Sequence, residues 1–336
     1  MGGLRDKIKL NSRRVRYRLR AFRKAAELSR VRFRADDLGQ EDILLFCTLR
    51  NEQPRLAFFL EYYRKLGVNH FFFVDNFSTD GTIEYLAEQP DVSLWRAEGS
   101  YKHARFGMDW LNFLLRRFGS GHWCLTVDPD EFLTFPHDDH RSLRDLTNWL
   151  ASRRLCAFPA MLLDMYGDGP IEAAFIEEGR DPFDVLQWFD AGSYSYKPNS
   201  YFGNIWIQGG PRQRLYFADS PQDAPSLNKI PLVFWNWRYV YASSTHMLLP
   251  TRVNRSVWAQ SGADRPSGVL RHAKFVAALT QKAAEEMERK QHFARSREYA
   301  SYLEGTAESP MTPQSSQYTG WRQLEALGLI SRGGWL

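Results

Sequence analysis

Apolar runs alternate with helically spaced apolar residues along the chain from Ile43 onward. Four runs predict buried strands: Ile43 to Thr48, His70 to Val74, Val92 to Trp95 and His122 to Val127. Between them, apolar residues recur every three or four positions and predict helices over 54–66, 79–88 and 103–118. Because strands joined by helical crossovers pair in parallel, the pattern predicts an α/β domain with a mostly parallel central sheet.

The pattern is weaker after Pro136. It predicts a helix at 143–150, a strand at 156–163, several strands within 201–249, a charged helical segment over 270–304 and a loosely held tail over the last thirty residues. We therefore divide the chain into three parts. They are an N-terminal arm (1–40), a main domain (41–260, with halves 41–136 and 137–260) and a C-terminal helical extension with its tail (261–336).

Charge is unevenly distributed over the 336 residues. The formal net charge is +5, but residues 1–34 hold thirteen Lys or Arg and only two acidic residues, so the arm is basic and the remainder acidic. Hydrophobic residues make up 43% of the chain and charged residues 25%, which excludes disordered, collagenous and coiled-coil proteins. The overall basic charge is therefore no argument for a nucleic-acid partner.

The arm predicts a basic helix with one apolar stripe, made of Leu4, Ile8, Val15, Leu19, Phe22 and Ala26. Such a helix suits the surface of an anionic membrane, and the alternative is a solvated helix or a frayed tail. The predicted basic helix of the arm holds only Tyr17 and Phe22 as aromatic residues, which disfavours nucleic acid as its partner.

The cysteines and the hydropathy bear on location. Cys47, Cys124 and Cys156 form neither a disulfide framework nor a CxxC metal motif, and each lies in an apolar run, as expected in a reducing compartment. No window reaches the roughly 18 apolar residues of a membrane span, and the first thirty residues lack the apolar core of a secretory signal. We expect a cytoplasmic protein, attached peripherally to the inner face of the membrane if the arm binds lipid.

The strongest chemical signal is the acidic segment Asp128, Pro129, Asp130 and Glu131, directly after a predicted strand. Ligands of parallel sheets collect at the carboxyl ends of strands, and clustered carboxylates repel one another unless a cation binds them. Carboxylate oxygens suit Mg²⁺ or Mn²⁺, which also bind phosphate oxygens. The alternative is a solvated acidic turn or a helix cap.

Two further loops follow predicted strands. Asp75 and Asn76 end the second strand, and an Asp at a strand end can accept hydrogen bonds from a nucleobase or ribose. Residues 78–81 of the same segment fit turn and capping chemistry. Thr48, Arg50 and Glu52 follow the first strand. Polar loops at the ends of three strands predict one shared site.

These residues resemble a known family. The stretches CTLRNE, LEYYRKLGVNHFFFVDNFSTDGT and WCLTVDPDEFL, within Ile43 to Pro136, are similar to the family 2-like glycosyltransferases of the GT-A fold, especially a bacterial group with an LGV…DN.S.DGT core. The resemblance continues more loosely through GGPRQRLYF, NKIPLVFW, SSTHMLL and LRHAKF.

The resemblance implies a nucleotide-diphosphate-sugar donor, a divalent cation and a glycan or lipid-linked acceptor. By position it implies nucleoside contacts from Thr48, Arg50, Glu52, Asp75 and Asn76. It also implies a DxD metal site at Asp128 and Asp130, with Asp128 touching the donor too. The first half of the main domain would then bind nucleotide and metal, and the second half the acceptor. The metal would stabilise the departing diphosphate, and family precedent favours inversion at the anomeric carbon.

The remaining roles are open at the level of sequence. The resemblance also implies a histidine in the C-terminal half as a further metal or diphosphate ligand; His246 is the favoured candidate and His272 the second, and a structural histidine is the alternative. Arg212 and Arg214 alternate on a predicted strand and are candidates for a phosphate clamp, as is Lys274. The alternative for these basic residues is that they lie on a solvated surface. Five acids are candidates for the catalytic base, with Asp164 favoured because it ends a predicted strand: Asp164, Glu172, Asp181, Asp184 and Asp190.

The sequence therefore predicts a metal-dependent glycosyltransferase of surface or extracellular polysaccharide synthesis. A nucleotidyltransferase is the nearest alternative enzyme, but the loop after the first strand lacks the Gly-rich and basic pattern of a phosphate loop. A non-enzymatic scaffold that uses the arm to bind membrane or nucleic acid is the third alternative.

Overall fold

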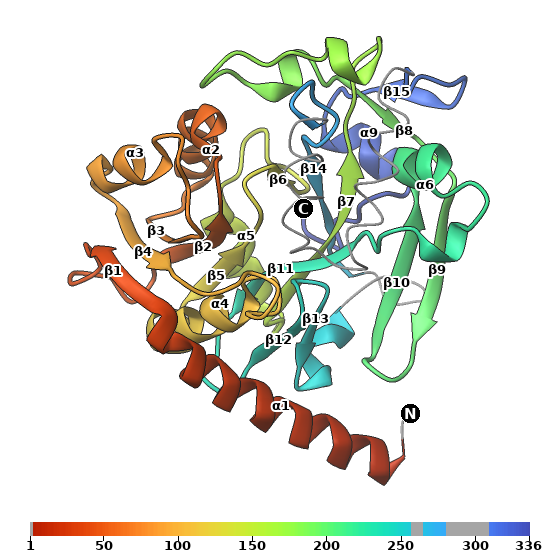
Figure 1. Cartoon of the computed structure of the whole chain (residues 1–336). Coiled ribbons are helices and arrows are strands. Elements are labelled where there is room, and N and C mark those ends of the chain that lie inside the picture. The colour runs from red at the N-terminus through yellow and green to blue at the C-terminus, as the bar shows by residue number, and fades with distance from the viewer. Residues whose placement is uncertain (1–2, 257–264, 280–308) are drawn as a thin grey trace.

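The fold is built on a nine-stranded central sheet with helices on both faces (Figure 1). The computed structural model describes residues 3–256, 265–279 and 309–336. In spatial order the sheet contains β1 (Leu28–Arg32), β4 (Val92–Ala97), β3 (His70–Asp75), β2 (Ile43–Leu49), β5 (Trp123–Thr126), β11 (Asn228–Phe234), β7 (Ala157–Asp164), β14 (Gly268–His272) and β6 (Glu131–Thr134). Three two-stranded sheets pair β9 (Tyr194–Asn199) with β10 (Asn204–Gly209), β12 (Val240–Ser243) with β13 (Met247–Leu249), and β8 (Trp188–Asp190) with β15 (Ser315–Gln317).

The described helices are α1 (Leu4–Lys24), α2 (Gln53–Leu66), α3 (Thr82–Glu88), α4 (Met108–Leu114), α5 (Leu143–Ser152), α6 (Gly210–Tyr216) and α9 (Trp321–Ala326). A π-helical turn, Leu115–Gly119, extends α4, and short 3-10 segments lie at Ala25–Glu27 and Thr251–Ser256. None of the described helices combines the length and apolar character needed to span a membrane.

The sheet confirms the predicted α/β class. Strands β4, β3, β2 and β5 are parallel neighbours, connected through the predicted helices, and β7 pairs in parallel with β14. Strands β1, β11 and β6 add antiparallel pairs. The parallel block brings the carboxyl ends of β2, β3 and β5 to one edge, because parallel strands run in the same direction.

Both faces of the parallel block are buried, and the sequence shows why. In β2, Leu45 and Cys47 join the core beneath α2, α3 and α5, whereas Leu44 and Phe46 join the core beneath α4. Successive side chains of a strand point to opposite faces, so a continuous apolar run serves two layers of helices.

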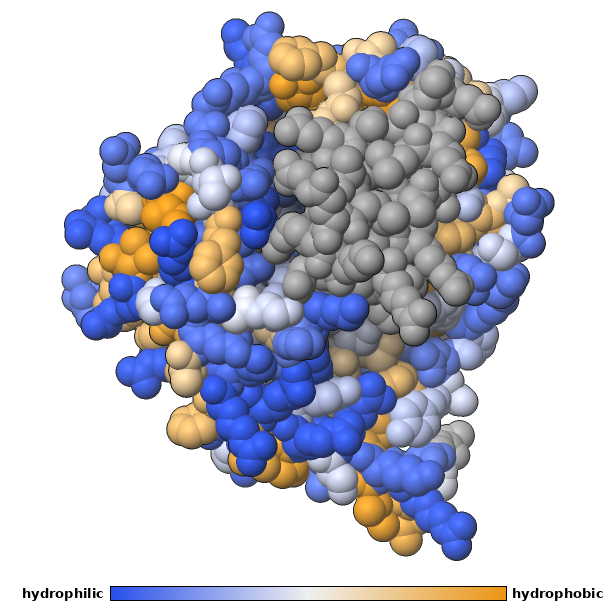
Figure 2. Space-filling model, viewed as in Figure 1, coloured by the Kyte–Doolittle hydropathy of each residue, from blue (hydrophilic) through white to orange (hydrophobic). Residues whose placement is uncertain are grey.

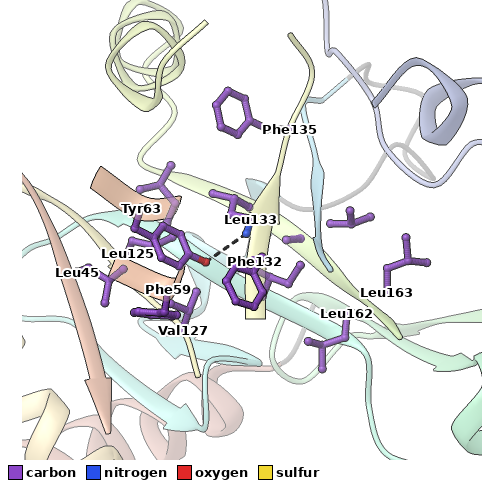
Figure 3. Packing of buried hydrophobic residues seen from close by; sticks show 14 of the residues in the cluster. Leu45, Phe59, Tyr63, Leu125, Val127, Phe132, Leu133, Phe135, Leu162 and Leu163 are labelled. Atoms are coloured by element: carbon purple, nitrogen blue, oxygen red, sulfur yellow. Dashed lines mark hydrogen bonds between the residues drawn. The ribbon is translucent and has the colours of Figure 1, made fainter. Parts of the chain in front are cut away.

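Tyr63 of α2 links that helix to the start of β6 (Figure 3). Its hydroxyl donates a hydrogen bond to the Glu131 carbonyl oxygen at 2.7 Å and accepts one from the Leu133 N–H at 3.2 Å. Phe59 and Phe132 pack beside the Tyr63 ring. The acidic turn that precedes β6 is therefore held by a buried polar contact within an aromatic cluster.

The N-terminal arm is ordered against the body. Helix α1 ends at Lys24 and leads into β1, which pairs with β4 at the sheet edge. The predicted helix is present, but the face that packs is formed by Leu10, Tyr17 and Ala21. The predicted apolar stripe is left exposed; for example, Leu4 is 74% and Phe22 68% exposed.

Three expectations for the second half were wrong. Arg212 and Arg214 lie in helix α6, because Gly209, Gly210 and Pro211 end β10 and begin a helical turn. Of the predicted helix 270–304, residues 270–272 belong to strand β14 (268–272), because Val269 and Leu270 fill the central core, and 273–278 are irregular chain and turn; residues 280–304 fall outside the described residues.

The third correction concerns the C-terminal tail, of which residues 309–336 are described. Trp321, Leu324 and Trp335 are buried, and β15 pairs with β8. The Trp321 indole N–H donates to Asp139 at 2.9 Å, so this segment is anchored by apolar and polar contacts. Ser, Thr and Pro residues suggested a loose tail, but the tryptophans decide its packing.

Candidate functional site

The three polar loops predicted to share a site follow β2, β3 and β5 and lie at one edge of the parallel block. Asp75, the last residue of β3, is paired with Leu49 of β2, and Thr126 of β5 is paired with Phe46. The Asn76 N–H donates to the Leu49 carbonyl at 2.9 Å, and the Arg50 guanidinium donates to the Asn76 carbonyl at 3.4 Å. The structure thus brings the first two loops into contact.

Asp75 is fully buried at this edge. Its Oδ2 accepts the Ser78 N–H at 3.1 Å, and burial raises the pKa of the carboxyl. Its Oδ1 is buried and has no hydrogen-bond partner among the described residues, and the same holds for the Thr48 hydroxyl. Buried polar atoms without partners are costly, so Oδ1 of Asp75 marks a place where a polar ligand would fit. Thr48 is paired with Val74, so its side chain points to the opposite face of the sheet from Asp75.

Glu52 and Asn76 have structural contacts at the same edge. The Glu52 carboxylate pairs with Arg55 at 2.9 Å, and the backbone N–H of Glu52 donates to the Thr82 hydroxyl at 3.1 Å. The Asn76 amide donates to the carbonyls of Ala97 and Gly99, at 3.2 and 3.0 Å. These contacts join the loops after β2, β3 and β4.

The acidic segment Asp128–Glu131 forms the turn between β5 and β6, and Glu131 begins β6. Glu131 is buried, and its Oε1 lies 2.7 Å from Nζ of Lys229 on β11. The same ammonium lies 3.4 Å from the half-exposed carboxylate of Asp128. Burial disfavours a charged lysine, but Glu131 and Asp128 outweigh burial and raise the pKa of Lys229. Lys229 is therefore the cation that neutralises one side of the turn.

Asp130 faces the other side of the turn. Its Oδ2 lies 3.3 Å from Nε2 of His272, the last residue of β14. Burial would raise the pKa of Asp130, but His272 outweighs burial and holds it well below its usual value, and Arg55 and Lys274 lower it further. The two aspartates of the predicted DxD motif thus have different partners, Lys229 for Asp128 and His272 for Asp130.

A buried chain of charges extends behind Asp130. Nδ1 of His272 lies 2.6 Å from Oδ1 of Asp164, and Oδ2 of Asp164 accepts Nε–H of Arg212 at 2.8 Å. Burial opposes ionisation of Asp164, but Arg212 and His272 lower its pKa to about 2. Both oxygens of Asp164, the favoured base candidate, are therefore occupied within the protein.

The donor set at Asp130 fits a divalent cation that also binds a ligand. Mg²⁺ and Mn²⁺ bind one or two carboxylates together with phosphate oxygens, and a metal-bound imidazole is oriented by a carboxylate on its other nitrogen. Asp130 and Nε2 of His272 supply two donors, and Asp164 orients the imidazole. Within the described ranges, no group of three or more His, Cys, Asp or Glu could hold a metal by itself, so phosphate oxygens would have to complete the shell.

Two other candidates, His246 and Arg214, make no hydrogen bond or ion pair with Asp130 among the described residues. Nδ1 of His246 lies 2.6 Å from the Asn228 carbonyl, and burial lowers the pKa of His246 to about 4. Within the described chain, His246 makes no hydrogen bond or ion pair with an acidic side chain. Arg214 pairs with Asp190 at 3.0 Å and donates to the Pro310 carbonyl at 2.7 Å, so it ties α6 to β8 and the C-terminal segment.

Lys229 was missed by the sequence analysis. The signal that could have found it is a lysine beside the apolar run IPLVF, since a lysine within a buried strand needs an acidic partner.

No protein-family model and no curated protein matches the chain. Among solved structures, mannosyltransferase PcManGT from Pyrobaculum calidifontis, in complex with GDP-Man and Mn²⁺, is 16% identical, with 89% of this chain and 80% of that chain covered and a TM-score of 0.30. HddC from Yersinia pseudotuberculosis is 9% identical, covering 64% of this chain and 79% of that chain, with a TM-score of 0.28. CMP:2-keto-3-deoxy-manno-octonic acid synthetase, complexed with CTP, is 12% identical, covering 66% of this chain and 78% of that chain, with a TM-score of 0.28. At these TM-scores the function has to be argued from the residues of the site.

Proposed function

We propose that the protein is a metal-dependent glycosyltransferase that moves a sugar from a nucleotide-diphosphate-sugar donor to a glycan or lipid-linked acceptor. The observation that carries the proposal is the acidic turn after β5, where Asp130 faces the oriented imidazole of His272. The turn lies at the strand edge that also holds the unpartnered oxygens of Asp75 and Thr48.

The nucleoside would bind at the loops after β2 and β3. The free Oδ1 of Asp75 would accept a hydrogen bond from the base or ribose, and the Thr48 hydroxyl lies on the neighbouring strand. Arg50, Glu52 and Asn76 would shape this subsite, because their contacts join the loops that form it.

The diphosphate would bind between the acidic turn and its cations. Asp130 and His272 would hold Mn²⁺ or Mg²⁺, which when bound would stabilise the negative charge of the departing diphosphate. Asp128 would contact the donor on the side where Lys229 already balances Glu131. The ammonium keeps this turn from being an unbalanced cluster of three acids when no donor is present.

We assign Asp164 and Arg212 to positioning. Arg212 holds Asp164 ionised, and Asp164 fixes the ring of His272 so that Nε2 faces Asp130. The base role predicted for Asp164 is not part of this proposal, because both carboxylate oxygens are hydrogen-bonded. Direct displacement with inversion, and a place in surface or extracellular polysaccharide synthesis at the cytoplasmic face of the membrane, complete the proposal.

The first experiment is a thermal-shift screen of UDP-, GDP-, CMP- and dTDP-sugars with and without Mn²⁺ or Mg²⁺. We expect one nucleotide class to raise the melting temperature of the wild type only when metal is present, and Asp130→Asn to abolish this increase. Asp219→Asn, at an exposed position, is the matched control and should respond like the wild type. If no nucleotide sugar shifts the wild type under any metal, the donor site is wrong.

Product analysis separates the proposal from a nucleotidyltransferase. A glycosyltransferase releases a nucleoside diphosphate from the nucleotide sugar, whereas a nucleotidyltransferase run in reverse consumes pyrophosphate and yields a nucleoside triphosphate with a sugar phosphate. Release of the diphosphate by the wild type, with none from Asp130→Asn, supports transfer. Pyrophosphate-dependent formation of the triphosphate would overturn it.

A further inference from the structure

Helix α1 is fixed to the body by one face. Leu10, Tyr17 and Ala21 are buried, and Arg105 lies over the Tyr17 ring, 3.7 Å from its centroid. Arg20 pairs with the buried carboxylate of Asp109 on α4 at 2.6 Å. The orientation of α1 about its own axis is therefore set by contacts with α4 and its neighbours.

The opposite face of α1 carries an apolar crest, formed by Leu4, Ile8, Val15, Leu19 and Phe22. Their exposed fractions are 74%, 58%, 43%, 55% and 68%. At 100° per residue these five positions fall within about 60° of one another around the helix axis. Figure 2 shows apolar groups among hydrophilic ones along the lower edge, where α1 lies in Figure 1. Exposed apolar side chains aligned along one face of a helix mark a candidate interaction site.

Basic side chains flank the crest on both sides. Helical geometry puts Lys7, Arg14 and Arg18 to one side of it, and Arg5, Arg16 and Arg23 to the other. This arrangement, with an apolar ridge between two basic rows, is typical of a helix that lies in the plane of an anionic membrane surface.

One basic row continues onto the body as an arginine pocket, a cavity of about 300 Å³ whose lining includes Arg18, Phe22, Arg116 and Arg117. Arg18, Arg116 and Arg238 also lie over the half-exposed ring of Trp237, at 4.8, 5.9 and 5.0 Å from its centroid. Tryptophan is a side chain that favours the membrane–water interface.

The arginine pocket lacks a built-in counter-charge. In the part of the chain that the structure describes, no carboxylate forms an ion pair with Arg18, Arg116, Arg117 or Arg238. The buried Nε of Arg18 has no hydrogen-bond partner among the described residues. Burial lowers the pKa of Arg18, and the neighbouring arginines, Arg116 first, lower it further. An anion in the pocket would relieve this repulsion.

We propose that the crest of α1 inserts into an anionic phospholipid bilayer while the arginine pocket binds lipid headgroup phosphate. Nucleic acid offers phosphates but no apolar phase for aliphatic side chains, so the crest favours lipid. The proposal does not depend on the transferase activity. The proposal gives the protein a fixed orientation on the bilayer: one face of α1 packs against the body, and the opposite face contacts the membrane.

The test is flotation of the full chain with vesicles of phosphatidylcholine alone or of phosphatidylcholine with phosphatidylglycerol. We expect binding to the anionic vesicles and at least about tenfold weaker binding to the neutral ones. Raising NaCl from about 0.1 M to about 0.5 M should weaken the binding, because the Debye length shortens.

Two variants divide the surface into its parts. Leu19→Ser with Phe22→Ser removes apolar area. Arg117→Glu with Arg238→Glu reverses one charge in the pocket lining and one beside it at Trp237. Each pair should weaken binding about tenfold or more while the melting temperature stays near that of the wild type. Phe175→Ser and Lys65→Glu are the matched controls, because both side chains are exposed and lie on other elements. They should bind like the wild type.

Three results would overturn the proposal. They are equal binding to neutral and anionic vesicles, unchanged binding of both surface variants, and binding to duplex DNA with none to anionic vesicles. A protein that binds lipid as expected but shows no nucleotide-sugar response would retain this inference and lose only the proposed transferase function.

Discussion

Nδ1 of His272 lies 2.6 Å from Oδ1 of Asp164, although the two residues are 108 positions apart in the chain. The contact follows from the register of the sheet, because β14 and β7 are parallel and pair these two residues directly. The other nitrogen of the ring is left to face Asp130 on the turn after β5. A strand contributed by the C-terminal part of the chain thus places a nitrogen donor at the predicted acidic site.

Asp164→Asn should weaken Mn²⁺ binding about 10- to 100-fold, because the carboxylate that orients His272 is lost. It should also lower the free energy of unfolding by about 3–5 kcal/mol, because the buried guanidinium of Arg212 loses the carboxylate of Asp164. Mn²⁺ binding is measured by electron paramagnetic resonance and stability by urea unfolding. The double variant Asp164→Asn with Arg212→Gln should regain part of the stability but not the affinity. Recovery of both would show that Asp164 acts only on stability.

Lys229→Met should destabilise the fold by about 3–5 kcal/mol, because Glu131 is left as a buried carboxylate without its cation. Adding Glu131→Gln to Lys229→Met should restore a large part of that loss, because the buried charge is then gone. Urea unfolding of the two variants and the wild type measures both effects. A loss below about 1 kcal/mol for the single variant would mean that water balances Glu131 without Lys229.

The sequence could predict the parallel block because its pattern is local. The runs at Ile43 and His70 are apolar throughout, and each is followed by a helix with its own periodicity. β14 could not be predicted in the same way, because its place in the sheet depends on β7 and β6, which lie far away in the chain. The charges that follow it favoured a helix.

The arm shows a different limit. The apolar stripe of α1 was found correctly, but the sequence does not tell which face of a helix meets the body. Tyr17, stacked with Arg105, and Arg20, paired with Asp109, decide the docked face, and they turn the more apolar face outward. The partners in both contacts lie more than 80 positions away, beyond the reach of any local pattern.

For the site, the sequence located the acidic turn but not its partners. Asp130 is a chemical signal by itself, since carboxylates after a strand are recognisable in one segment. The partner histidine is not, because the sequence around His246 or His272 does not tell which of them the fold brings to the acidic turn. The fold separates them: His272 faces Asp130, whereas His246 is hydrogen-bonded to the Asn228 carbonyl.

Asp109→Ala should loosen the docking of α1. Asp109 has no exposed side-chain area and pairs with Arg20 at 2.6 Å and Arg105 at 2.9 Å, so its removal leaves Arg105 without a buried counter-charge. We expect a loss of about 2–4 kcal/mol of stability and faster hydrogen exchange in residues 4–24. Mass spectrometry of exchange measures this directly, with Asp219→Ala as the control at an exposed position. Unchanged exchange in α1 would mean that its apolar contacts alone hold it.

His70 should make the protein less stable in acid. Its Nε2 lies 2.9 Å from the Ser93 hydroxyl, which also accepts the Arg34 N–H at 3.0 Å. Burial lowers the pKa of His70 to about 4, below the 6.5 of an unfolded chain. Between these values the unfolded state binds more protons, so the free energy of unfolding falls as the pH falls through this window.

From about pH 7.5 to about pH 5, His70 should account for about 2 kcal/mol of the stability lost by the wild type. His70→Asn keeps a polar side chain at β3 without a titrating ring, so its loss over the same range should be smaller by about that amount. Urea unfolding at both pH values measures the difference. Other titrating groups contribute equally to both proteins and cancel in the comparison. Parallel stability curves for the two proteins would show that the folded protein accepts a proton at His70 without cost.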